Sequence, residues 1–123
     1  MTEQQLMNQT HKLMEELDLL KECYFSHEPP KSKNDKHFFL MVKEKTQPIY
    51  QMLETWEEEA LHLIKERKAD VHPQQITSTR ENMELLLLHS FYIDVKRKRY
   101  MELNHSVTYI FNQLLRDLAR HNT

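Results

Sequence analysis

The sequence predicts an all-α protein, an up-down-up-down four-helix bundle that forms a single domain over residues 1–123. Three observations support this fold class. Glycine, which sheets and tight hairpins use at positive φ, is absent from the chain. Four stretches carry apolar residues at the spacings of three and four that are typical of amphipathic helices. Residues 85–88 are four consecutive leucines, which point in four directions around a helix axis and predict a central helix enclosed by the others.

The first helix is predicted to begin at Thr2, because Thr2 and Gln5 have the spacing of a capping box. It is predicted to end near Phe25, ahead of Pro29 and Pro30. Its apolar stripe has the alternating spacing of a coiled-coil seam and consists of Leu6, Thr10, Leu13, Leu17, Leu20 and Tyr24.

The second helix is predicted over residues 35–69, with Asn34 or Asp35 as its N-cap. Its stripe consists of Phe38, Val42, Ile49, Leu53, Trp56, Ala60 and Leu63. Pro48 lies inside this stripe, yet the stripe keeps its phase on both sides of the proline. We therefore expect one long helix that bends near Pro48. The alternative is two helices that break at residues 46–47.

The second half of the chain predicts two further helices. Residues 70–77 contain Pro73 and are predicted to form a loop, and Ser78 with Glu81 has the spacing of a capping box that would start the third helix. Its predicted buried face consists of Leu85, Leu88, Tyr92 and Val95. The stripe of the fourth helix consists of Tyr100, Leu103, Val107, Phe111, Leu114 and Leu118. The two stripes are out of register by about 80–100°, which predicts a break within residues 94–100. One uninterrupted helix is the alternative.

Composition excludes several classes of protein. The net charge of −2 gives no general attraction to nucleic acid or to a membrane surface. No apolar run approaches the roughly 18 residues of a membrane span, and the first residues lack the features of a signal peptide. Cys23 is the only cysteine, so no intrachain disulfide forms. We expect a protein of the cytoplasm without a cofactor.

One candidate site is a buried polar cluster of Glu81, His89 and Tyr92 on the third helix. Glu81 lies within about 40° of the predicted buried face, where a carboxylate needs hydrogen bonds or a wet position. The cluster is either a small acid–base or ligand site, or a set of side chains that satisfy one another and fix the helix register.

A di-metal site is the second candidate, because ferritin-like bundles use Glu-x-x-His pairs on two helices and single glutamates on the other two. Glu59 with His62 and Glu102 with His105 have this spacing. The other helices would supply Glu15, Glu16, Glu81 or Glu84. His62 lies about 120° from Trp56 around its helix, however, so it points away from the core. We therefore interpret both pairs as surface residues. A metal-binding or small-molecule-binding bundle enzyme is the alternative function.

The third candidate is a basic end of the bundle, because the first and third connections of this topology meet at the same end. The first contains Lys31, Lys33, Asp35 and Lys36, and the third contains Lys96, Arg97, Lys98 and Arg99. Together they carry six net positive charges, which would attract an anionic ligand or partner. Tyr100 is the single aromatic residue among them, so the signal for nucleic acid is weak. The alternative is that these cations only solubilise turns.

Four segments carry a resemblance to a known family: His72-Pro73-Gln74-Gln75, Thr79-x-Glu81-Asn82, Leu88-His89-Ser90-Phe91-Tyr92 and Arg99-Tyr100-Met101-Glu102-Leu103. They resemble the YppE-like proteins, small helical proteins of Bacillus-type bacteria, over the whole chain. The resemblance implies a four-helix bundle and implies no activity or functional residues. We expect a non-enzymatic protein that acts by binding an unidentified protein partner.

Overall fold

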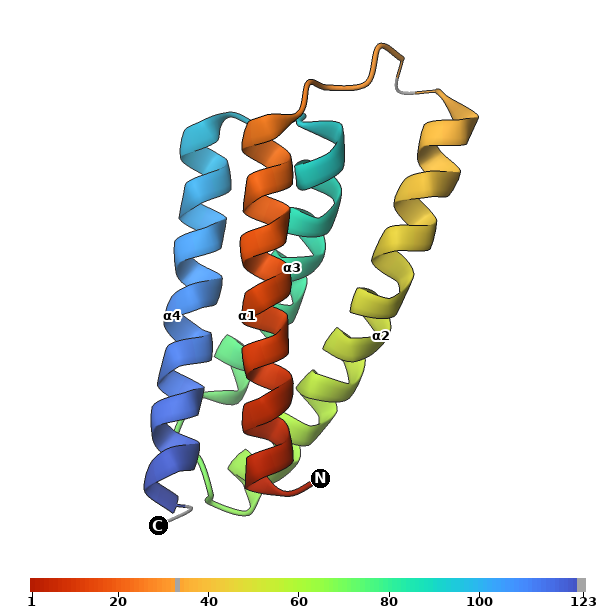
Figure 1. Cartoon of the computed structure of the whole chain (residues 1–123). Helices are drawn as coiled ribbons and strands as arrows, with labels where there is room; N and C mark the ends of the chain where they lie inside the picture. The colour runs from red at the N-terminus through yellow and green to blue at the C-terminus, as the bar shows by residue number, and fades with distance from the viewer. Residues whose placement is uncertain (33, 122–123) are drawn as a thin grey trace.

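The computed structural model describes residues 1–32 and 34–121 and consists of four helices (Figure 1). They are α1 (Glu3–Ser26), α2 (Lys36–Lys65), α3 (Pro73–Tyr92) and α4 (Arg97–His121). Each helix runs opposite to the one before it, so the predicted up-down-up-down bundle is confirmed (Figure 1).

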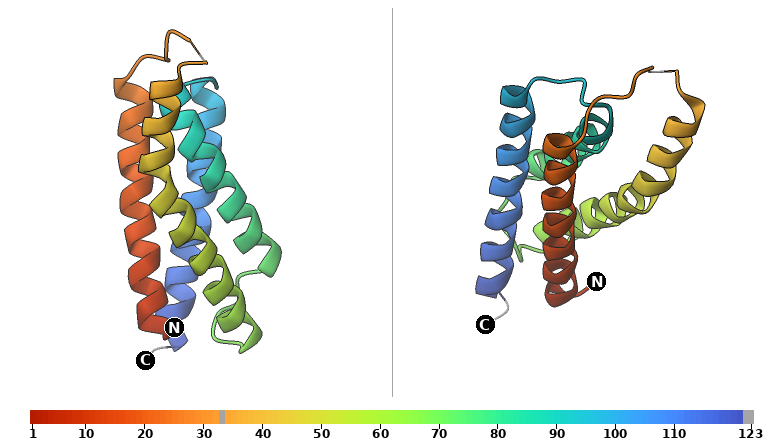
Figure 2. Two further views of the ribbon diagram at one scale, coloured as in Figure 1. Left: turned by 90° about the vertical axis from the view of Figure 1, so that its right-hand side faces the viewer. Right: turned by 45° about the horizontal axis from the view of Figure 1, so that its top comes forward.

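The bundle is not square in cross-section. Over the described residues every pair of helices is in contact except α2 and α4. The helices α1 and α3 lie between them, and the N-terminal half of α2 leans away from the other helices (Figures 1 and 2). Side chains still link α2 to α3 at the end where α2 begins, because the ring centroids of Phe38 and Tyr92 lie 5.1 Å apart.

The first helix matches its prediction closely. The Thr2 hydroxyl accepts from the backbone N–H of Gln5, and the Gln5 side chain accepts from the backbone N–H of Thr2, which completes the predicted capping box. All six residues of the predicted stripe are buried.

The second helix is continuous through Pro48, which confirms one long helix and excludes the break at residues 46–47. Figure 2 shows that it curves along its length. The predicted N-cap, Asp35, accepts from the backbone N–H of Phe38. The predicted end was wrong, because α2 ends at Lys65. Arg67 has a φ of 64°, and the N–H of Lys68 donates to the carbonyl of Leu63, which closes a Schellman motif.

Replacing Arg67 by glycine should stabilise the protein. A non-glycine residue in the left-handed region is strained by contact between its Cβ and the backbone, and glycine removes that contact. We expect Arg67→Gly to raise the free energy of unfolding by about 1 kcal/mol in a denaturant titration. A loss of stability would mean that the Arg67 side chain contributes more than its backbone strain costs.

The start of the third helix corrects the sequence prediction. Residues 73–77 belong to α3 and not to a loop, and Ser78 and Glu81 do not form its cap. His72 is the N-cap, because its Nδ1 accepts from the backbone N–H of Gln74, and the Gln75 side chain accepts from the N–H of His72. Pro73 occupies the first helical turn, where its fixed φ favours a helix and its missing N–H costs nothing.

The predicted buried face of α3 was also wrong, and the true core face lies almost opposite. Its buried residues are Ile76, Thr79, Met83, Leu86, Leu87 and Ser90, whereas Leu85 and Leu88 are 41% and 43% exposed. The hydroxyls of Thr79 and Ser90 donate to the backbone carbonyls of Gln75 and Leu86, so these small polar residues fit a core position.

The break between the third and fourth helices is confirmed. α3 ends at Tyr92, Ile93 adopts a left-handed conformation with a φ of 51°, and α4 begins at Arg97. All six residues of the predicted α4 stripe are buried, together with Asn104, Ile110 and Asp117.

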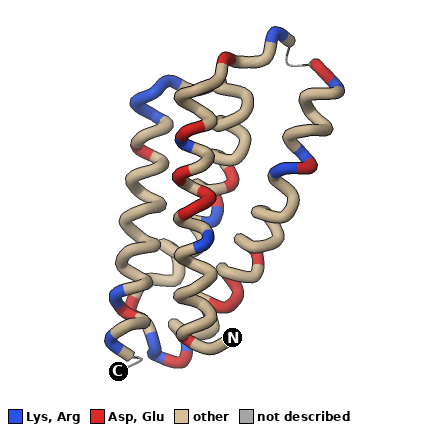
Figure 3. Tube along the Cα trace, viewed as in Figure 1, with Lys and Arg blue, Asp and Glu red and all other residues tan. Residues whose placement is uncertain are grey.

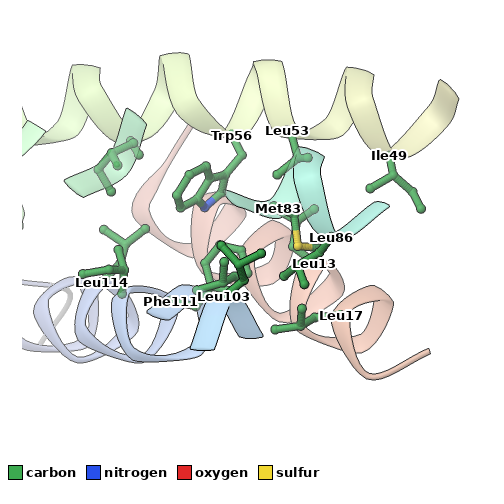
Figure 4. Close-up of a cluster of buried hydrophobic side chains, with 14 of the residues drawn as sticks. Leu13, Leu17, Ile49, Leu53, Trp56, Met83, Leu86, Leu103, Phe111 and Leu114 are labelled. Carbon is green, nitrogen blue, oxygen red and sulfur yellow. The ribbon is translucent and has the colours of Figure 1, made fainter. Parts of the chain in front are cut away.

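The core contains side chains from all four helices around Trp56 (Figure 4). Near the basic end, Tyr100 is fully buried, and its ring stacks on that of Tyr24 with the centroids 4.0 Å apart. The Tyr100 hydroxyl lies 2.6 Å from the Ser90 Oγ. Ser90 uses its own hydrogen on the Leu86 carbonyl, so Tyr100 is the donor.

Alkaline pH should destabilise the protein through Tyr100. Burial raises the pKa of Tyr100 from 10.0 to about 12. The folded state therefore keeps a proton that the unfolded chain loses as pH rises from 10 to 12, so the free energy of unfolding falls there. The stability advantage of the native protein over Tyr100→Phe should shrink between pH 9 and pH 12 in urea titrations. An advantage that is the same at all pH values would show that the phenol is not desolvated.

Candidate binding surfaces

The predicted basic end exists, but its cations form two groups. Both connections lie at the end of the bundle where α2 and α4 begin (Figure 1). Figure 3 shows a basic stretch at the start of α4 on one side of this end, and other cations in the connection before α2 and at the start of α2 on the other. Lys33 lies outside the described residues. The described members of the two groups lie apart, because α1 and α3 lie between α2 and α4.

The stronger group is the run from Lys96 to Arg99 at the start of α4. The guanidinium of Arg97 lies 5.2 Å above the ring of Phe25, and Arg99 lies 3.8 Å from the Glu102 carboxylate. Lys96 and Lys98 form no ion pair with any described residue. Cations at a helix N-terminus oppose the helix dipole, and α4 has no acidic residue in its first turn.

The predicted buried polar cluster does not form. Glu81 is exposed and lies 3.9 Å from Arg80, and the Nδ1 of His89 lies 2.8 Å from the Asp94 carboxylate. Tyr92 packs edge to face against Phe38 of α2, with the ring centroids 5.1 Å apart. The prediction failed because it placed Glu81 and Tyr92 on the core face of α3. The buried hydroxyl pair of this region is Ser90 with Tyr100.

The two Glu-x-x-His pairs lie on α2 and α4, whose backbones are not in close contact. Glu59 lies 3.3 Å from the N-terminal ammonium, and His62 lies 2.8 Å from Glu66. Over residues 1–32 and 34–121 no group of three or more His, Cys, Asp or Glu side chains is placed to hold a metal ion.

A surface that the sequence did not predict lies between α2 and α3. Two hollows of about 410 and 370 Å³ lie between the helices, and a third of about 490 Å³, lined by α2 alone, adjoins the first. We call this the α2–α3 surface and define it by the residues that line the three hollows: Leu40, Lys43, Glu44, Gln47, Pro48, Tyr50, Gln51, Glu54, Glu57, Arg80, Glu81, Asn82, Glu84, Leu85 and Leu88. Leu40 is 51% exposed at one end, and Leu85 and Leu88 lie at the α3 side. The surface therefore exposes three leucines to solvent, at positions where polar side chains would have cost the fold little.

Acidic side chains accompany these leucines. Arg80 lies 2.6 Å from Glu84 and 3.4 Å from Glu57, so one cation is held among several carboxylates. With Glu54 and Glu81 included, the defined residues carry three net negative charges. Burial, followed by the charge of Glu84, raises the pKa of Tyr50, which lines two of the hollows.

The four leucines at residues 85–88 could have indicated this surface in the sequence. A helix with leucines on all sides either is enclosed on all sides or exposes some of them. Leu86 and Leu87 are fully buried, and Leu85 and Leu88 face outward beside α2. Periodicity alone could not show which pair was buried, because both pairs are apolar.

Comparison with known proteins places the chain in a family. Residues 10–118 match the family model described as a bacterial domain of unknown function (DUF1798). The chain belongs to this family. It is 28% identical to the uncharacterized protein YppE of Bacillus subtilis over 127 aligned positions, which cover 100% of this chain and 99% of that protein. The resemblance to YppE-like proteins is confirmed, and no activity is attached to either name.

Two solved structures of Bacillus subtilis YppE share the fold. The crystal structure matches with a TM-score of 0.85 at 28% identity, over 99% of this chain and 98% of that one. The solution structure matches with a TM-score of 0.80 at 24% identity, over 100% and 99%. Both are all-α arrangements like the one in Figure 1. Within the described residues no helix is both long and apolar enough to cross a membrane.

Proposed function

We propose that this protein acts in the cytoplasm by binding another protein at the α2–α3 surface, without catalysing a reaction. The observation that carries the proposal is the exposure of Leu85 and Leu88 beside α2. Contiguous exposed apolar residues with a polar rim are typical of interaction sites on soluble proteins. The hollows between and beside these helices give a partner segment a place to lie.

The partner segment that fits this surface is an amphipathic helix with basic residues. A helix laid in a groove between two helices places its apolar stripe on the groove, as in other helix-in-groove complexes. Leu40, Leu85 and Leu88 would contact that stripe. Glu54, Glu57, Glu81 and Glu84 would lie beside lysines or arginines on its flanks, because the surface carries net negative charge.

Peptide binding to the purified protein tests this proposal. One synthetic helix carries leucines at helical spacing with lysines elsewhere, and its control carries glutamates in place of the lysines. At low salt we expect the lysine peptide to bind at least about tenfold more tightly and to shift backbone amides of α2 and α3. The double substitution Leu85→Gln/Leu88→Gln should weaken binding by about tenfold or more.

The matched control is Leu19→Gln, because Leu19 is 58% exposed on α1 and does not line the surface. Equal losses for Leu19→Gln and the double variant would contradict the proposal, as would equal binding of the two peptides. Sedimentation equilibrium should give a monomer. A dimer that the double variant abolishes would make a second copy of this chain the occupant and would overturn the choice of partner.

Binding of an anionic partner at Lys96–Arg99 is a second candidate function. It is favoured by four consecutive cations at the start of α4, where they oppose the helix dipole and where Lys96 and Lys98 form no ion pair with any described residue. Titration with polyphosphate at low salt should shift the amides of residues 96–99 first, and the shifts should vanish near 0.3 M salt, where screening is strong. The amides of residues 34–36 should respond less, because the start of α2 lies on the other side of this end. Shifts scattered over the whole surface would leave these cations as solubilising residues.

A further inference from the structure

A groove between α3 and α4 adjoins the α2–α3 surface across α3, and Asn82 lines both. It encloses about 600 Å³, which is within the range of small-molecule sites. None of the nine residues that line it is Asp, Glu, Lys or Arg. Its apolar floor includes Ile110, which is buried.

The walls of this groove offer hydrogen-bonding groups that the fold leaves unused. Asn82 of α3 and His105 and Ser106 of α4 line it. Their side chains make no hydrogen bond or ion pair with any residue in the described ranges. Gln74 donates to Ser78 over 3.4 Å, which leaves the carbonyl oxygen of the Gln74 amide available. The groove therefore presents several donors and acceptors of no net charge.

The exposed ring of Tyr109 lies between this groove and a second hollow that contains Arg116. The Tyr109 side chain is 61% exposed, and it lines both the groove and a second hollow of about 540 Å³. Arg116 lines the second hollow, seven residues further along α4, which is about 10 Å along the helix axis. Arg116 forms no ion pair with any described residue. Asp117 already accepts from the backbone N–H of Asp70 and from Arg120, so its charge is compensated.

We infer that this part of the protein binds a nucleotide. The base would stack on Tyr109, its edge would exchange hydrogen bonds with Asn82 and Gln74, and its phosphate would lie against Arg116. Amide side chains match the paired donors and acceptors of base edges, and base stacking on aromatic rings tolerates different bases. A neutral saccharide would leave Arg116 unused, and inorganic phosphate would leave the ring and the amides unused.

Titrations of the full chain followed by amide chemical shifts test the inference. The probes are adenosine 5′-monophosphate, adenosine, glucose and inorganic phosphate. We expect the nucleotide to shift amides of residues 74–82 and 105–116 in one saturable process. Tyr109→Leu should weaken nucleotide binding about tenfold, and Tyr109→Phe, which keeps the ring, should not weaken it more than about twofold. Both substitutions are at an exposed position, and unchanged thermal unfolding would show that the fold is intact.

Arg116→Gln separates the two halves of the site. The nucleotide should bind the native protein about threefold more tightly than adenosine does, and Arg116→Gln should remove this difference while leaving adenosine binding unchanged. The inference is overturned if no probe shifts these amides saturably, or if inorganic phosphate reproduces the shifts caused by the nucleotide. Glucose binding as tightly as adenosine would also overturn it.

Discussion

Trp56→Ala should lower the free energy of unfolding by about 3–5 kcal/mol, the range for truncating a large buried aromatic residue. The Trp56 side chain is fully buried and packs edge to face against Phe111 of α4, with the ring centroids 5.2 Å apart. Its Nε1–H donates to the Thr10 Oγ1 of α1 over 3.0 Å. This residue therefore connects α2 to α4, although the backbones of the two helices are not in close contact (Figure 4). Denaturant titrations followed by far-ultraviolet circular dichroism measure the loss without needing the indole.

Substitutions of Thr10 separate the hydrogen bond from the packing. The Thr10 hydroxyl donates to the carbonyl of Leu6, so it can only accept from the indole. Thr10→Val leaves the indole N–H unpaired in the core and should cost about 1–3 kcal/mol, whereas Thr10→Ser keeps the acceptor and should cost less. A Trp56→Ala variant no less stable than an exposed substitution would show that α2 is not anchored through this residue.

Leu87→Ala should lower the free energy of unfolding by about 2–5 kcal/mol, whereas Leu88→Ala should cost less than about 1 kcal/mol. The two leucines are neighbours in the sequence and lose the same atoms on substitution. Leu87 is fully buried, and Leu88 is 43% exposed beside Tyr50 and Leu85. The difference in denaturant midpoint between the two variants reports which face of α3 is in the core. A larger loss for Leu88→Ala than for Leu87→Ala would show that Leu88 is on the buried face of α3, as the periodicity predicted.

Much of the fold could be predicted because three helices have one apolar face each. In α1 and α4 every residue of the predicted stripe is buried, and in α2 the phase of the stripe correctly indicated that the helix continues through Pro48. The third helix differs because it is apolar on both sides. Its core face contains Thr79 and Ser90, whose polarity is hidden by hydrogen bonds to their own helix. Because Thr79 and Ser90 are polar, the core face of α3 does not stand out in the sequence as a periodic row of apolar residues.

The start of α3 was missed for a related reason. Pro73 suggested a loop, but a proline is equally compatible with a first helical turn, and the His72 side chain supplies the cap. Only part of the candidate sites could be predicted from the sequence. The cations of residues 96–99 lie at the expected end, yet their separation from Lys31 and Lys36 depends on the packing order of the helices. The α2–α3 surface could not be found before the buried face of α3 was known.

Site-specific photocrosslinking in a bacterium that produces this protein tests the central claim most directly. A photoreactive residue in place of Leu88 is compared with one in place of Tyr109, which is exposed on α4 and outside the α2–α3 surface. Mass spectrometry then identifies the segment that is joined to each position. We predict that position 88 captures one segment with apolar residues at helical spacing and a net positive charge, and that position 109 does not. Capture of the same proteins at both positions, or of an acidic segment at position 88, would contradict the account.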